Sequence, residues 1–180
     1  MATVRSLRLD VRRDIVIDVP RWQVWEYLAD FQRHTEWSQP EHKLRIEPPS
    51  ELRAGATFIS VGKELGHEWR NTVTITEVTL GERLEFVASH DTSAWRNFFE
   101  LSDAGDGTRV TKGEKFVSAR FPMIVLVAVL MPWLSWETGR VFTADLARIK
   151  ARLELRASSA ASHSNIGVNV TSRPYGIRTP

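Results

Sequence analysis

Histidine and asparagine side chains recur in segments that alternate like β-strands, and they are the residues best suited to chemistry. His67 and Asn71 share one face of their segment, and His90 and Asn97 share the apolar faces of the next two. Histidine changes its charge near neutral pH, so His67 and His90 are the candidates for acid–base catalysis. Asn71 and Asn97 could donate hydrogen bonds to a carbonyl group. The alternative that each of these groups lies at a strand end in water stays open.

The apolar residues around these polar groups indicate which face of each strand is buried. Successive side chains of a strand point to opposite faces, so residues of one parity share a face. Arg70 has the opposite parity and could polarise a carbonyl only if the parity of its strand were reversed. Phe98 is apolar but has the opposite parity to Trp95 and Phe99, so the buried face of that strand is ambiguous. The predicted inward set is His67, Trp69, Asn71, Val73, Ile75, Leu84, Phe86, Ala88, His90, Trp95, Asn97, Phe99 and Leu101.

Other kinds of active site are not indicated by the sequence. The absence of cysteine excludes disulfides, thiolate metal sites and a cysteine nucleophile. His34, Glu36, Glu41 and His42 are close in sequence, but they lack the spacing of metal ligands, so no metal site is predicted. No phosphate-binding loop or dinucleotide fingerprint occurs, and we expect no cofactor. No Ser-His-Asp order or paired carboxylates stand out.

Charge and composition indicate a soluble globular protein with an electrically balanced body. The chain has 180 residues, with 24 Lys+Arg against 22 Asp+Glu, and the excess comes from Arg173 and Arg178 near the C-terminus. A balanced body argues against nucleic-acid binding. We predict one domain over 1–156 and a disordered tail over 157–180, which is rich in Ser, Ala, Asn and Gly. The N-terminus lacks the apolar stretch of a secretory signal, which predicts a cytoplasmic protein.

The elements that must position these side chains follow from periodicity and turn residues. Segment 11–19 alternates as a strand, 20–29 has helical spacing, and a second short helix is expected to end near Trp37. A long helix is predicted over 132–156, with Pro132 in its first turn. Short loops between the remaining strands predict an antiparallel meander. Those strands are 44–46, 57–61, 69–77, 84–90, 95–101 and 108–117.

The uncharged run 121–136 precedes and enters the predicted long helix. It lies between Arg120 and Glu137, and its nine-residue stretch Met123–Met131 is well short of the roughly 20 residues that span a bilayer. Three interpretations stay open: an apolar lid over a pocket, a patch that touches a membrane or a partner chain, and a buried helix start. The absence of Lys and Arg within the run disfavours the membrane version. An exposed run would favour a homodimer over a monomer.

The order of elements, together with four short motifs, resembles the helix-grip fold of the START-related (SRPBCC) superfamily, of the polyketide cyclase/dehydratase type. Each motif occupies the place that it has in that family, and together they cover about 11–156. Fold alone does not fix function. The motifs are Pro20, Val24, Trp25, Leu28, Asp30, Phe31 and Trp37; 53–58; 107–111; and 145–150 with Glu154.

The resemblance implies an α+β architecture in which a curved antiparallel sheet of about six to seven strands wraps a long C-terminal helix. Two short helices would follow the first strand, and a cavity would lie between sheet and helix. The implied function is binding or carriage of a hydrophobic small molecule: a lipid, polyketide or aromatic metabolite. A cyclase/dehydratase using His67 or His90 and a protein-interaction module are the alternatives. The predicted ligand-binding residues are Trp37, Trp69, Asn71, Phe86, His90, Trp95, Asn97, Phe116 and Phe142.

Overall fold

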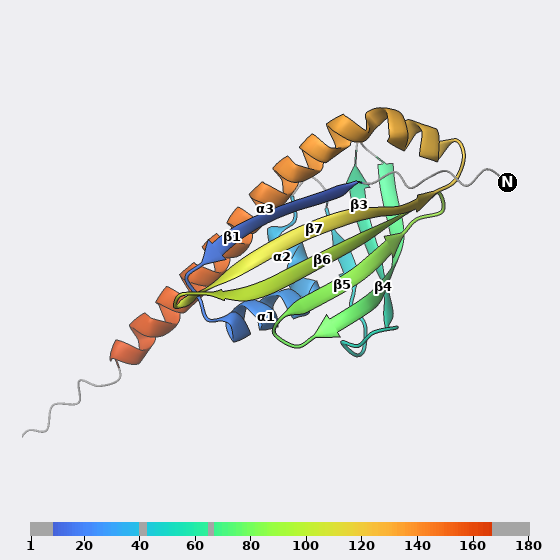
Figure 1. Ribbon diagram of the computed structural model, residues 1–180. Helices are drawn as coiled ribbons and strands as arrows, with labels where there is room; N and C mark the ends of the chain where they lie inside the picture. Colours follow the sequence, from blue (N-terminus) through green and yellow to red (C-terminus); the bar gives the residue numbers. More distant parts are fainter. Residues whose placement is uncertain (1–8, 40–42, 65–66, 167–180) are drawn as a thin grey trace, which may run out of the picture.

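A computed structural model of the chain describes residues 9–39, 43–64 and 67–166. The fold is an α+β helix grip: a seven-stranded sheet, in the order β1-β7-β6-β5-β4-β3-β2, holds one long helix (Figure 1). The predicted fold class is confirmed. The elements are β1 (Asp10–Ile17), α1 (Arg21–Ala29), η1 (Phe31–Arg33), α2 (His34–Trp37), β2 (Arg45–Glu47), β3 (Thr57–Glu64), β4 (His67–Thr79), β5 (Arg83–Ser89), β6 (Ser93–Ala104), β7 (Gly107–Ala119) and α3 (Met123–Ile166).

Consecutive strands from β2 to β7 all pair antiparallel, and tight turns join β4 to β5 and β6 to β7. Gly81 and Gly105 lie in the turns after β4 and β6 with φ of 74° and 63°. Glycine adopts this left-handed conformation without the steric cost that a Cβ brings. The chain therefore reverses direction at both points, and the predicted meander is confirmed.

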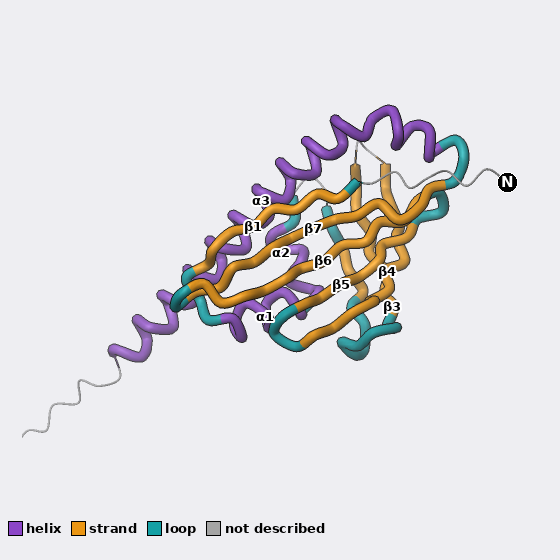
Figure 2. Tube along the Cα trace, viewed as in Figure 1, coloured by secondary structure: helices purple, strands orange, loops and turns teal. Residues whose placement is uncertain are grey.

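The second half of α3 packs into the concave side of the sheet. Phe142, Leu146, Ile149 and Leu153 follow one another at helical spacing and are at most 5% exposed. Burying such side chains contributes about 1.5–3 kcal/mol each. Figure 2 shows α3 running along the sheet beside β1, and its last turns extend beyond the strands. This half of the helix is therefore the core helix of a soluble fold.

The first half of α3 differs from the prediction, because the helix begins at Met123 and not at Pro132. The amides of Ile124 and Val125 bond to carbonyls at residues 120 and 122, so the helical hydrogen bonds start there. Pro132 lies inside the helix, where it lacks an amide for the helical ladder, and α3 bends in this region (Figure 1). The helix also runs on to Ile166, so the start of the predicted disordered tail is helical, while 167–180 lie outside the described residues.

The outer face of the sheet explains the ambiguous parity at Phe98. This ring lies against Gly113 of the neighbouring strand, where an added Cβ would be 2.1 Å from the ring. The guanidinium groups of Arg12 and Arg83 lie 5.1 and 5.0 Å from the ring centroid, and Phe98 is only 1% exposed. Phe98 is thus an outward residue whose burial comes from charged neighbours, and the inward parity of Asn97 and Phe99 holds.

Candidate functional site

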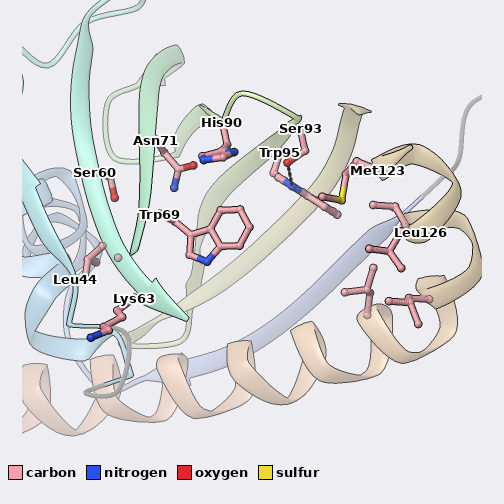
Figure 3. A pocket seen from close by; sticks show the side chains of 14 residues that line it. Leu44, Ser60, Lys63, Trp69, Asn71, His90, Ser93, Trp95, Met123 and Leu126 are labelled. Carbon is pink, nitrogen blue, oxygen red and sulfur yellow. Dashed lines mark hydrogen bonds between the residues drawn. The ribbon is translucent and has the colours of Figure 1, made fainter. Parts of the chain in front are cut away.

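A pocket of about 410 Å³ opens between the sheet and the first turns of α3. Figure 3 shows the Trp69 ring in its centre, with Asn71 and His90 beside it and the α3 residues Met123 and Leu126 across the pocket. An apolar pocket with a few polar groups is typical of small-molecule sites. We call it the outer pocket; its lining residues are Leu44, Ser60, Gly62, Lys63, Trp69, Asn71, His90, Ser93, Trp95, Met123, Leu126, Val127, Leu130 and Leu134.

Trp69 and His90 form the polar centre of the outer pocket. Trp69 precedes Asn71 by two residues on β4, so both side chains point the same way, while His90 follows β5 directly. The Trp69 and His90 rings meet edge to face with centroids 4.9 Å apart. Trp69 Nε1 and His90 Nδ1 are both buried and have no hydrogen-bond partner among the described residues. A buried polar atom without a partner costs about 1–3 kcal/mol, so a ligand that pairs with it is favoured.

The first turns of α3 cover one side of this pocket. Met123, Leu126, Val127, Leu130 and Leu134 recur every three or four residues, so they form one stripe of the helix toward the pocket. Of the three interpretations of the run 121–136, a buried helix start is wrong, since the opposite side of the same turns is exposed to solvent. One stripe of the run lines the pocket, as a lid would.

A second, inner pocket of about 250 Å³ lies toward η1 and α2. Leu44 and Ser60 line both pockets, so the two are neighbours along the inside of the sheet. Aromatic rings pack closely in its wall; Phe31 and Phe86 meet edge to face at 5.4 Å. Its other lining residues include His34, Trp37, Ile46, Phe58, Val73, Ala88, Asn97, Phe99, Lys112, Val141 and Asp145.

A buried ion pair is the most strongly polar feature of the inner pocket. Lys112 Nζ on β7 lies 2.5 Å from Asp145 Oδ2 on α3, and the two side chains are 11% and 5% exposed. The ammonium group also lies 4.6 Å from the Trp37 ring centroid and 4.5 Å from that of Phe142. Aromatic faces attract a cation, so the two rings and the carboxylate together surround the Lys112 ammonium group with favourable contacts. Trp37 Nε1 is buried beside them and has no partner among the described residues.

His34 is buried in the wall of the inner pocket, where its role is structural. Its Nε2 donates to the Leu28 carbonyl at 2.8 Å. Burial lowers the pKa of His34 to about 4, and the charge of Lys112 acts in the same direction. The ring is therefore neutral near pH 7. Within the described part of the chain no three His, Cys, Asp or Glu side chains gather as a metal site; Glu41 and His42 lie outside that part.

The structure distributes the predicted ligand-binding residues over three places. Trp69, Asn71, His90 and Trp95 line the outer pocket, and Trp37, Phe86 and Asn97 line the inner one. Phe116 and Phe142 line neither: they belong to a small apolar cluster beside the pockets, in which Phe116 meets the Trp95 ring at 5.1 Å. His67 begins β4, and its side chain lies outside the described residues.

Sequence reasoning missed Lys112 and Asp145 as members of the site. Lys112 has the same parity on β7 as the buried residues Thr108 and Val110, which was the available signal. Asp145 lies next to the buried stripe of α3, three residues after Phe142 and one before Leu146. A charged residue on a buried face is unusual unless it is paired, so the two together would have indicated an ion pair.

Similar solved structures confirm the fold. The Zhui aromatase/cyclase from Streptomyces sp. R1128 is 17% identical with a TM-score of 0.66, over 83% of this chain and 96% of that one. A Mycobacterium smegmatis protein is 18% identical with a TM-score of 0.63, over 82% and 92% of the two chains. A Nitrosomonas europaea protein is 19% identical with a TM-score of 0.62, over 83% and 97%. At such identities the likeness shows the fold alone.

A family model identifies the family of the chain, which structures of such low sequence identity do not. None of the curated proteins compared with the chain matches it. The model for polyketide cyclase / dehydrase and lipid transport proteins matches residues 8–154, which include every described strand and the core half of α3. Both pockets lie between elements of that matched region. The chain therefore belongs to the polyketide cyclase / dehydrase and lipid transport family.

Proposed function

We propose that the protein binds a largely apolar small molecule in the outer pocket and holds its polar group at Trp69 and His90. The observation that carries the proposal is the pair of buried, unpartnered atoms Trp69 Nε1 and His90 Nδ1 in an otherwise mostly apolar wall. Nε1 of tryptophan can only donate, so the ligand must offer an acceptor oxygen there. The membership of a family that includes lipid transport supports this function.

The size of the two pockets supports a ligand larger than a simple metabolite. The outer pocket alone, at about 410 Å³, falls in the range of small-molecule sites. The inner pocket adds about 250 Å³ beside it, across Leu44 and Ser60. A lipid chain, a polyketide or an aromatic metabolite would fit this combination: its polar group at Trp69 and His90, and its body between the aromatic rings and α3.

A titration with the fluorescent probe anilinonaphthalene sulfonate tests the proposal. The probe should bind saturably and be displaced by fatty acids or aromatic polyketones. Trp69→Phe keeps a ring but removes Nε1–H, and should weaken binding of a displacing ligand by about tenfold, the worth of one hydrogen bond. Trp22→Phe is the matched control, because Trp22 is 60% exposed and lies outside both pockets. Absence of saturable binding, or equal losses in both variants, would refute the proposal.

An enzyme of the cyclase/dehydratase type is the second candidate, and the position of His90 favours it. His90 lies in the pocket wall beside Asn71, where an imidazole could move a proton at a bound carbonyl compound. His90→Ala should abolish turnover of a poly-β-ketone analogue, a loss greater than any weakening of its binding. The same change at His67, the other predicted acid–base residue, gives the comparison. Full turnover by both variants would exclude both histidines as the acid–base residue, and no turnover by the wild-type chain would leave binding as the function.

A further inference from the structure

The outer side of the first turns of α3 is a continuous apolar surface. Val125, Val129, Trp133 and Trp136 follow one another by four, four and three residues, which places them along one side of the helix. With Phe121 just before the helix they form what we call the α3 apolar face. Their exposed fractions run from 52% at Val125 to 83% at Phe121. Exposed apolar groups gathered in this way mark an interaction surface.

Two cationic side chains occur near the α3 apolar face or at the pocket beside it. No charged residue occurs between Arg120 and Glu137, and Glu137 is paired with Arg140 at 2.5 Å. Lys63 of β3 lines the outer pocket, and Arg120 precedes the face. Neither Lys63 nor Arg120 forms an ion pair with another described residue. Residues outside the run 121–136 therefore supply cations that the run itself lacks. These cations complement an anionic surface.

The pattern of residue types points to a lipid surface as the partner. Aromatic side chains stand at both ends of the face, Phe121 at one and Trp133 with Trp136 at the other, while valines occupy its middle. Tryptophan prefers the boundary between headgroups and hydrocarbon. By length and composition Met123–Ser159 could cross a membrane, with 11% of its apolar window buried. Leu146 and Ile149 are nevertheless packed in the core, so the second half of α3 remains packed against the sheet and does not enter a membrane.

We propose that the α3 apolar face docks on the surface of a phospholipid bilayer, with the helix lying in the headgroup region. Leu126 and Leu130 connect this face to the pocket, because both line the outer pocket and are still 51% and 37% exposed. Docking would therefore place the mouth of the pocket against the lipid. The inference depends on the exposed face and its charged border, and it does not require Trp69 or His90 to bind a ligand.

Vesicle flotation tests this docking with two matched substitutions on one helix. Val129 is 72% exposed within the face, and Leu155 is 68% exposed outside it. The wild-type chain should float with vesicles of phosphatidylcholine and phosphatidylglycerol, and the Trp133 and Trp136 emission should shift to the blue. Val129→Asp should lower the partition coefficient about tenfold or more, since a carboxylate must then be buried among the lipids. Leu155→Asp should bind as the wild type does.

Three results would overturn the proposal. The first is the absence of flotation with vesicles of this composition, and the second is an equal loss of vesicle binding in both variants. The third is a wild-type chain that binds no vesicles but forms a dimer, which Val129→Asp converts to a monomer. The last would make a second copy of the chain the partner of the face. Probe binding in lipid-free buffer separates this proposal from the function above: Val129→Asp should still bind the probe. A docking failure with normal probe binding refutes docking alone.

Discussion

Removing one partner of the buried pair Lys112–Asp145 should destabilise the protein strongly. The two side chains are 11% and 5% exposed, so a charge left without its partner cannot be solvated by water. Losing one member of such a pair costs about 3–5 kcal/mol of unfolding free energy. Replacing both members by apolar residues removes the desolvation cost as well and is often nearly neutral.

The surroundings of each partner decide which single substitution costs more. Asp145 has a second cation, Arg148, at 3.3 Å, whereas the other near groups of Lys112 are the Trp37 and Phe142 rings. Lys112→Met therefore leaves a carboxylate that is still partly compensated, and we expect a loss of about 3 kcal/mol. Asp145→Leu leaves an ammonium group among aromatic rings, and we expect a loss of about 4 kcal/mol. Lys112→Met/Asp145→Leu should lose less than either.

Urea denaturation of the four proteins in a double-mutant cycle measures these effects. The matched control is the pair Arg109–Asp14, whose atoms also lie 2.5 Å apart but whose side chains are 50% and 52% exposed. Arg109→Met should cost less than about 1 kcal/mol. The reasoning is refuted if Lys112→Met costs no more than Arg109→Met, or if the double variant loses the sum of the two single losses.

Two further changes test packing and titration. Gly113→Ala would put a Cβ 2.1 Å from the Phe98 ring, so we expect a loss of about 1–3 kcal/mol by urea denaturation; an unchanged midpoint would contradict this contact. Burial holds the pKa of His34 near 4, below its ordinary 6.5, so the unfolded chain takes up its proton first as pH falls. Stability should therefore be complete above pH 6.5 and fall toward pH 4, by about 3 kcal/mol from this group. In denaturation curves measured over a series of pH values, His34→Gln should lose less stability between pH 6.5 and pH 4 than the wild type does. An identical loss in the two proteins would show that other groups cause it.

The sequence predicted most of the fold and part of the site, because both depend on local alternation. Trp69, Asn71 and His90 were assigned to the inner face from parity alone, and the structure brings them into one pocket. Turn glycines such as Gly105 correctly separated the strands. That these residues bind a ligand, and that the protein is cytoplasmic, stay predictions.

The rest depended on tertiary packing that periodicity does not contain. Pro132 looked like a helix start, since proline fits the first turn, but the apolar residues before it form helix while they cover the pocket. Lys112 on β7 pairs with Asp145 on α3, and nothing in the sequence around either residue identifies the other as its partner. Whether the run 121–136 is covered or exposed likewise depends on how far α3 extends past the sheet.

Native mass spectrometry of the protein purified from its own host, before and after extraction with organic solvent, tests the central claim most directly. The account predicts a bound mass on the wild-type chain that extraction removes. Trp69→Phe should carry less of it, whereas Trp22→Phe should carry the same amount. A wild-type protein that shows only the mass of the bare chain, and that takes up no apolar probe after extraction, would contradict ligand binding in the outer pocket.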